Sequence, residues 1–150
     1  MEEMRSALEA EDGTLFGHVS GTDASRTCRA GLWLAFGFLD ESHAISQELP
    51  TPEGSYWHGI LHRREPDASN ASYWFRRVGE HPIFERLSRD GRGLGLVMQS
   101  EHWNPFDFID MCEKYRGTDD GEQETLLRQV QLKEWDLLFD WCFRVAISKG

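Results

Sequence analysis

Two histidines stand one helical turn apart in the stretch "SYWHGILHRRE". They are His58 and His62, and Glu65 follows three residues later. On a helix these side chains share one narrow stripe, so that both imidazoles can reach a single ion and the carboxylate can complete or orient the set. The pattern is compatible with a divalent metal site with His58 and His62 as ligands. It is also the pattern of two histidines that border the core and hydrogen-bond to neighbouring backbone or carboxylate groups, and both interpretations stay open. It is not the HExxH pattern of metalloproteases, because Gly59 stands in place of the glutamate.

A third histidine, His43, lies in "FLDESHAISQ" on the same helical face as Asp40 and Gln47. A carboxylate three residues before a histidine can hold the ring and raise its basicity, as a general base requires. The commoner result of this spacing is a hydrogen bond within the helix. Both interpretations of His43 stay open at this stage.

The next segment, "NASYWFRRVG", places Asn70, Tyr73, Trp74 and Arg77 on one face. An amide, a phenol, an indole and a guanidinium combine fixed geometry with polar tips, as many ligand sites do. A guanidinium can also bind both oxygens of a carboxylate or phosphate at once. We therefore expect Arg63 or Arg77 to hold an anionic group, with Tyr73 and Trp74 packed against the body of the ligand.

Charge separates this region from the rest of the chain. The whole sequence carries a formal net charge of −10, whereas residues 54–79 hold four arginines against one glutamate and one aspartate. An acidic protein is a poor partner for nucleic acid or for an anionic membrane. A local basic region suits a small anionic molecule better than a polymer.

The remaining composition predicts one cytoplasmic domain. A chain of 150 residues has the size of an ordinary domain. Its longest apolar run, "GLWLAFGFL", is too short to span a bilayer, and the acidic start "MEEMRSALEAEDG" lacks the features of a signal peptide. The three cysteines are widely spaced, which favours buried thiols in a reducing compartment.

The periodicity predicts an all-α fold, a single-domain irregular multi-helix bundle over residues 1–150. Residues 1–21 show little pattern and are expected to form a loosely ordered arm. The expected helices cover residues 23–48, 54–65, 69–79, a segment that starts at Pro82, 104–117 and 126–148. Ser55 is the expected cap of the second helix, and the glycine-rich "DGRGLGLVM" at 90–98 is expected to be a loop.

The C-terminal helix carries two adjacent apolar stripes, which predict that it lies across the core. One contains Leu132, Trp135, Phe139, Cys142 and Ala146, and the other contains Leu127, Val130, Leu138, Trp141 and Val145.

One block of the chain, residues 38–84, contains three distinctive stretches. They are "DESHAISQ", "TPEGSYWHGILHRREPD" and "NASYWFRRVGEHP". They resemble a family of small uncharacterised bacterial and fungal proteins that share this block, about a third of the chain. The resemblance implies that the polar block is intact here. It supplies no reaction, cofactor or substrate.

Three functions compete for the polar block. The favoured one is binding of a small anionic molecule in a polar pocket formed by residues 40–77. The second is a metal-dependent, hydrolase-like enzyme in which His58 and His62 act with Glu65 or His43 around a divalent ion or as bases. The third is a buried polar network without a ligand, which stabilises only when every member is paired.

Overall fold

The structure is a computed structural model that describes residues 1–9 and 22–148. Within these ranges the chain forms helices and no strands, which confirms the prediction of a single all-α domain with an irregular bundle. The helices are α1 (Glu2–Glu9), α3 (Asp23–Ala35), α4 (Leu39–Ser46), α5 (Pro52–Arg64), α6 (Ala68–Val78), α7 (Ile83–Leu94), α8 (Pro105–Tyr115) and α9 (Gly121–Ser148).

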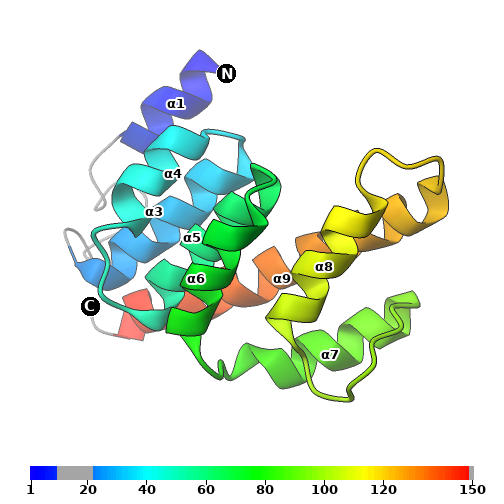
Figure 1. Cartoon of the computed structure of the whole chain (residues 1–150). Coiled ribbons are helices and arrows are strands. Elements are labelled where there is room, and N and C mark those ends of the chain that lie inside the picture. Colours follow the sequence, from blue (N-terminus) through cyan, green and yellow to red (C-terminus); the bar gives the residue numbers. More distant parts are fainter. Residues whose placement is uncertain (10–21, 149–150) are drawn as a thin grey trace.

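The helices form two groups that share one long helix. Figure 1 shows α3, α4, α5 and α6 together on one side, α7 and α8 on the other, and α9 running behind both. The contacts agree, since α9 packs against α3, α7 and α8 while α5 packs against α3, α4 and α6. No helix in the described ranges is both long enough and apolar enough to cross a bilayer.

Helix α5 is the centre of the first group, and every residue from Gly54 to Arg63 is buried. Two glycines let its neighbours approach closely. A Cβ atom on Gly59 would lie 2.7 Å from the ring of Phe75 on α6, and one on Gly31 of α3 would lie 2.6 Å from the ring of Trp57. The glycine at the position of the HExxH glutamate is therefore explained by packing.

The expected helix over residues 23–48 is wrong in one respect, because the chain breaks into α3 and α4. Gly37 adopts φ +81° between them, in the left-handed region that glycine occupies at little cost. Phe36 is the C-terminal cap of α3, and α4 then packs back against α3. This reversal sets His43 on a short helix of its own.

Three other boundaries differ from expectation, and one is the start of α9 at Gly121 rather than at residue 126. Helix α5 begins at Pro52 rather than at Ser55, because the Thr51 side chain accepts a hydrogen bond from the Gly54 N–H at 3.1 Å and proline suits the first turn. The segment predicted as a loop from residue 90 remains helical to Leu94, and Gly95 at φ +110° ends α7. A helical glycine costs only about 1 kcal/mol, which tertiary packing readily offsets.

The N-terminal segment contains a helix where little pattern was apparent. In α1, Leu8 is buried, and Arg5 forms an ion pair with Glu41 of α4. The rest of the expected arm, residues 10–21, lies outside the described residues.

Helix α9 contributes a long row of buried residues, as its stripes predicted. The buried members are Leu127, Val130, Glu134, Leu138, Cys142 and Ala146. Leu132, which was assigned to a stripe, is 63% exposed. The row has one unexpected member, the fully buried Glu134.

Candidate metal centre

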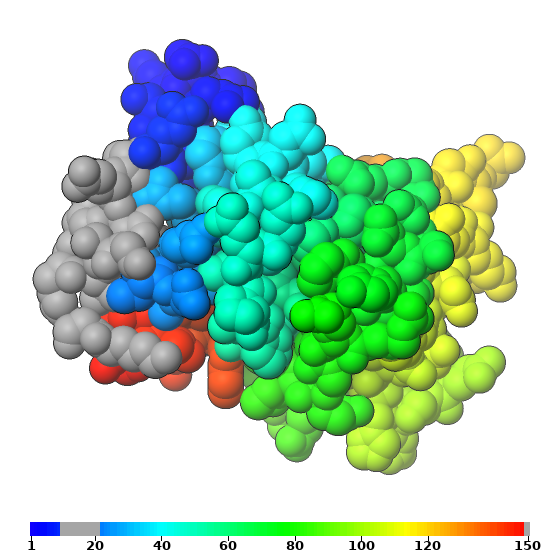
Figure 2. All heavy atoms as spheres, turned by 60° about the vertical axis from the view of Figure 1, so that its left-hand side comes forward, coloured from blue at the N-terminus to red at the C-terminus, as the bar shows by residue number. Residues whose placement is uncertain are grey.

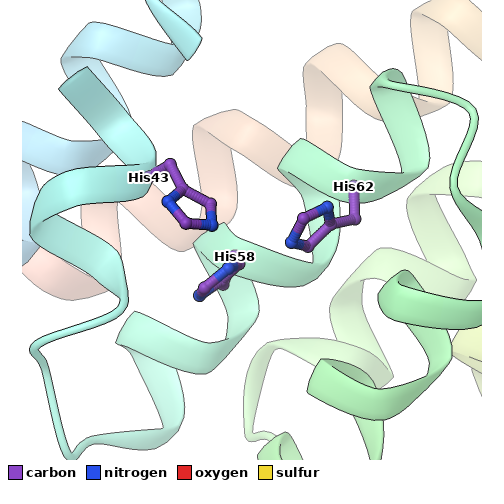
Figure 3. A group of neighbouring side chains, drawn as sticks. All are labelled: His43, His58 and His62. Carbon is purple, nitrogen blue, oxygen red and sulfur yellow. The ribbon is translucent and has the colours of Figure 1, made fainter. Parts of the chain in front are cut away.

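The three histidines that sequence analysis singled out come together between two helices. His58 and His62 project from the same face of α5, and His43 reaches them from α4, which packs against α5. Figure 2 shows the α4 segment, in cyan, beside the green segment of α5 and α6 on one face of the molecule. Figure 3 shows the three rings gathered around one space, with a ring nitrogen of His62 turned toward the other two rings.

The geometry is close to that of a metal site. One ring nitrogen from each of the three histidines lies within 4.8 Å of the others. His58 and His62 are 2% and 6% exposed, and His43 is half-buried, so the cluster approaches the surface at His43. His43 meets His58 edge to face, with ring centroids 4.5 Å apart.

His58 is held by stacking rather than by hydrogen bonds. Its imidazole lies 3.8 Å from the indole of Trp74, at an interplanar angle of 14°. Neither of its ring nitrogens has a hydrogen-bond partner in the described part of the chain. Buried polar atoms are nearly always paired, so the lone pair of a neutral His58 ring is open to a ligand.

Burial lowers the pKa of His58 to about 3, with smaller contributions from His43 and His62. The charged imidazolium is disfavoured in this apolar and crowded position. His58 is therefore neutral near pH 7 and offers a nitrogen lone pair, which is the form that binds a metal ion.

Glu65 stands beside the cluster, as its spacing predicted. It caps the end of α5, and its Oε2 lies 3.2 Å from Nδ1 of His62. The carboxylate is thus on the outer side of the ring, next to the nitrogen nearer the backbone.

The expected ligand face of α6 is partly joined to the histidines. Trp74 contacts His58 directly, and Tyr73 contacts Trp74 edge to face at 5.1 Å. The Arg77 guanidinium lies 5.4 Å from the centre of the Trp74 ring and 5.9 Å from that of Tyr73. Asn70 instead lies in the first turn of α6, where its backbone and side-chain N–H groups donate to the capping residue Asp67.

Arg63 lies in a different environment from the histidines. It is 1% exposed, and its guanidinium forms a two-point ion pair with Glu134 of α9. The Tyr56 hydroxyl donates to the same carboxylate at 3.0 Å. Glu134 was not among the residues expected at a site. Its ion pair holds the Arg63 guanidinium within the core.

Two further histidines in the described ranges lie away from the cluster. Nδ1 of His81 accepts a hydrogen bond from the Ile83 N–H at 3.2 Å, and its Nε2 lies 3.3 Å from Glu53, so this residue ties α7 to α5. His102 lies on the wall of a cavity of about 620 Å³ beside α7, together with Arg89 and Trp103. None of His43, His58 and His62 contributes to that cavity.

The donor set fits a divalent transition ion. Imidazole nitrogen suits zinc, copper, iron and nickel, whereas calcium and magnesium prefer oxygen ligands. Zinc–nitrogen bonds of 2.0–2.1 Å place tetrahedral ligand atoms about 3.4 Å apart. The observed nitrogens therefore need to approach one another by roughly 1.4 Å at most to bind zinc.

Comparisons of the chain with protein-family models, with curated proteins and with solved structures gave no match. The candidate site therefore rests on its own geometry.

Proposed function

We propose that this chain binds one divalent transition-metal ion, of the zinc class, through His43, His58 and His62. The observation that supports it is the convergence of three ring nitrogens within 4.8 Å, two of them from buried histidines. A polar set of this kind is costly to bury unless something binds it.

The number of ligands bears on the kind of site. Among the described residues, no further histidine, cysteine, aspartate or glutamate joins the three as a candidate ligand. Structural zinc sites use four protein ligands, whereas catalytic sites use three and keep one position for an exchangeable ligand. The proposed centre is of the second type, which supports a metal-dependent, hydrolase-like enzyme over a structural ion.

The test is metal content combined with matched histidine variants. Protein purified without chelator is analysed for metals, and metal-free protein is then titrated with zinc chloride by calorimetry. We expect about one zinc per chain, lost in His58→Ala and His62→Ala and kept in the control His102→Ala. Melting temperatures of the metal-free variants show whether each still folds. A wild-type chain that takes up no zinc would refute the proposal.

A second candidate function, binding of a small anionic molecule, is favoured by Arg77. This residue is exposed and rests on Tyr73 and Trp74, and no hydrogen bond or ion pair in the described part of the chain uses its guanidinium. Trp74 in turn stacks on His58, so the same indole contacts both the Arg77 guanidinium and one histidine of the cluster. If an anion binds both the open position of the metal ion and the Arg77 guanidinium, metal binding and anion binding belong to one site.

The cysteines bear on the location of the protein. Cys28, Cys112 and Cys142 are buried, and none of them forms a disulfide with another cysteine of the described residues. Such thiols suit a reducing compartment, and we propose the cytoplasm.

A further inference from the structure

We propose that Glu65 is a positioning residue of the three-histidine cluster, which fixes the tautomer of His62 so that Nε2 faces the ion. This inference deepens the proposed function and rests on it for its consequence in metal binding. The positioning itself is a property of the metal-free chain.

The contact between the two side chains is local and protected. His62 and Glu65 are separated by three residues at the end of α5, and their closest atoms, Nδ1 and Oε2, lie 3.2 Å apart. The His62 side chain is 8% exposed and that of Glu65 is 37% exposed, so the carboxylate reaches inward from the rim. The oxygen lies off the line of a straight hydrogen bond, since Nδ1 has none by strict geometry.

The direction of the ring agrees with this role. Figure 3 shows one nitrogen of His62 pointing toward His43 and His58 and the other pointing away from them. A neutral imidazole carries one N–H and one lone pair, and a carboxylate next to one nitrogen draws the proton there. With Nδ1 protonated toward Glu65, the lone pair is on Nε2, inside the cluster.

His62 is thereby distinguished from His58. No carboxylate or carbonyl group is bonded to either nitrogen of His58 within the described ranges, and its orientation depends on stacking with Trp74. His62 is thus the ligand whose tautomer a neighbouring carboxylate can set before the ion arrives. Partners of this kind typically raise metal affinity by about 10- to 100-fold.

The decisive experiment is a long-range ¹H–¹⁵N correlation spectrum of the histidine rings in metal-free protein, for the wild-type chain, Glu65→Ala and Glu65→Gln. We expect His62 to be in the Nδ1–H form in the wild-type chain and to shift toward the Nε2–H form in Glu65→Ala. Glu65→Gln keeps an acceptor oxygen and retains the wild-type form. Glu48→Ala removes a carboxylate that pairs with Arg26, and serves as the charge-matched control.

Zinc affinity, measured by competition with a chelator, supplies the second readout. Glu65→Ala is expected to weaken binding by about 10- to 100-fold, with Glu65→Gln between it and the wild-type chain and Glu48→Ala unchanged. An Nε2–H form of His62 in the wild-type chain, or an unaltered tautomer in Glu65→Ala, overturns the role of Glu65. Failure of the wild-type chain to bind zinc overturns the proposed function instead, and the spectrum of the metal-free protein separates the two.

Discussion

The imidazole of His58 lies face to face on the indole of Trp74, with their centroids 3.8 Å apart. The stack is part of the burial of His58, and this burial disfavours protonation of the ring and lowers its pKa. Because a lowered pKa means that the unfolded chain binds a proton more readily than the folded one, this relationship affects stability as well as binding.

The first prediction concerns pH. The unfolded chain protonates His58 below its usual pKa of 6.5, whereas the folded chain does so only near pH 3. Stability is therefore retained above pH 6.5 and falls between pH 6.5 and about 3, by at most about 1.4 kcal/mol per pH unit from this residue.

Urea unfolding of metal-free protein at pH 7.5 and pH 5.0 measures this effect. His58→Gln should show a smaller difference between the two pH values than the wild-type chain, since it lacks the titrating group. His102→Gln, which changes an exposed histidine, should keep the wild-type difference. Equal pH dependence in His58→Gln and the wild-type chain would contradict the prediction.

The second prediction concerns the buried ion pair. Glu134→Gln leaves the Arg63 charge uncompensated in the core and should lower the free energy of unfolding by about 3–5 kcal/mol. Glu122→Gln changes an exposed glutamate on the same helix and should have little effect. Chemical denaturation compares the two. A loss as small as that of the control would mean that Arg63 finds another partner.

The third prediction concerns the close approach of α5 and α6. A methyl group at Gly59 meets the Phe75 ring, so Gly59→Ala should destabilise the fold by about 1–3 kcal/mol. Gly93 of α7 is a helical glycine with open space around its Cβ position, and Gly93→Ala should stabilise by about 0.5–1 kcal/mol. Thermal unfolding of both variants gives the sign of each change in stability. A stabilising Gly59→Ala would contradict the prediction and show that α5 and α6 can move apart.

The fourth prediction concerns Arg77. Calorimetric titration of zinc-loaded protein with inorganic phosphate should show binding that Arg77→Ala weakens by roughly 10- to 100-fold, the value of a charged hydrogen bond. Arg76, its exposed neighbour, has no ring contact with Trp74 among the described interactions, and Arg76→Ala should bind as the wild-type chain does. Equal losses in both variants would indicate a general charge effect.

Sequence periodicity sufficed for the fold class and for the starts of α3, α6, α7 and α8, because caps and prolines act locally. Asn104 and Pro105 begin α8 as expected, and Asp67 caps α6. The break at Gly37 was missed because a glycine inside an apolar run gives no local sign of whether it will adopt a positive φ. That depends on the packing of α4 against α3.

In the candidate site, too, local features could be predicted from the sequence and tertiary contacts could not. The spacing of His58 and His62 on one helix was sufficient to pair them, and Glu65 followed from the same helix. The approach of His43 depends on a tertiary contact between α4 and α5 and could not be inferred from spacing. Glu134 did leave a signal, since it stands midway between the apolar Val130 and Leu138, where a charge implies a buried partner. Its partner Arg63, in another helix, could not be read from the sequence.

The separation of α4 from α3 at Gly37 decides which helices a bound ion would stabilise. His43 belongs to a short helix that also holds α1 through Arg5 and Glu41, whereas His58 and His62 belong to the buried α5. An ion shared by these histidines would link α4 to the buried α5. The free energy of ion binding would then stabilise α4 and α1 against local unfolding. Amide hydrogens of α4 and α1 should then exchange more slowly with solvent deuterium when zinc is present, while those of α8 keep their rates.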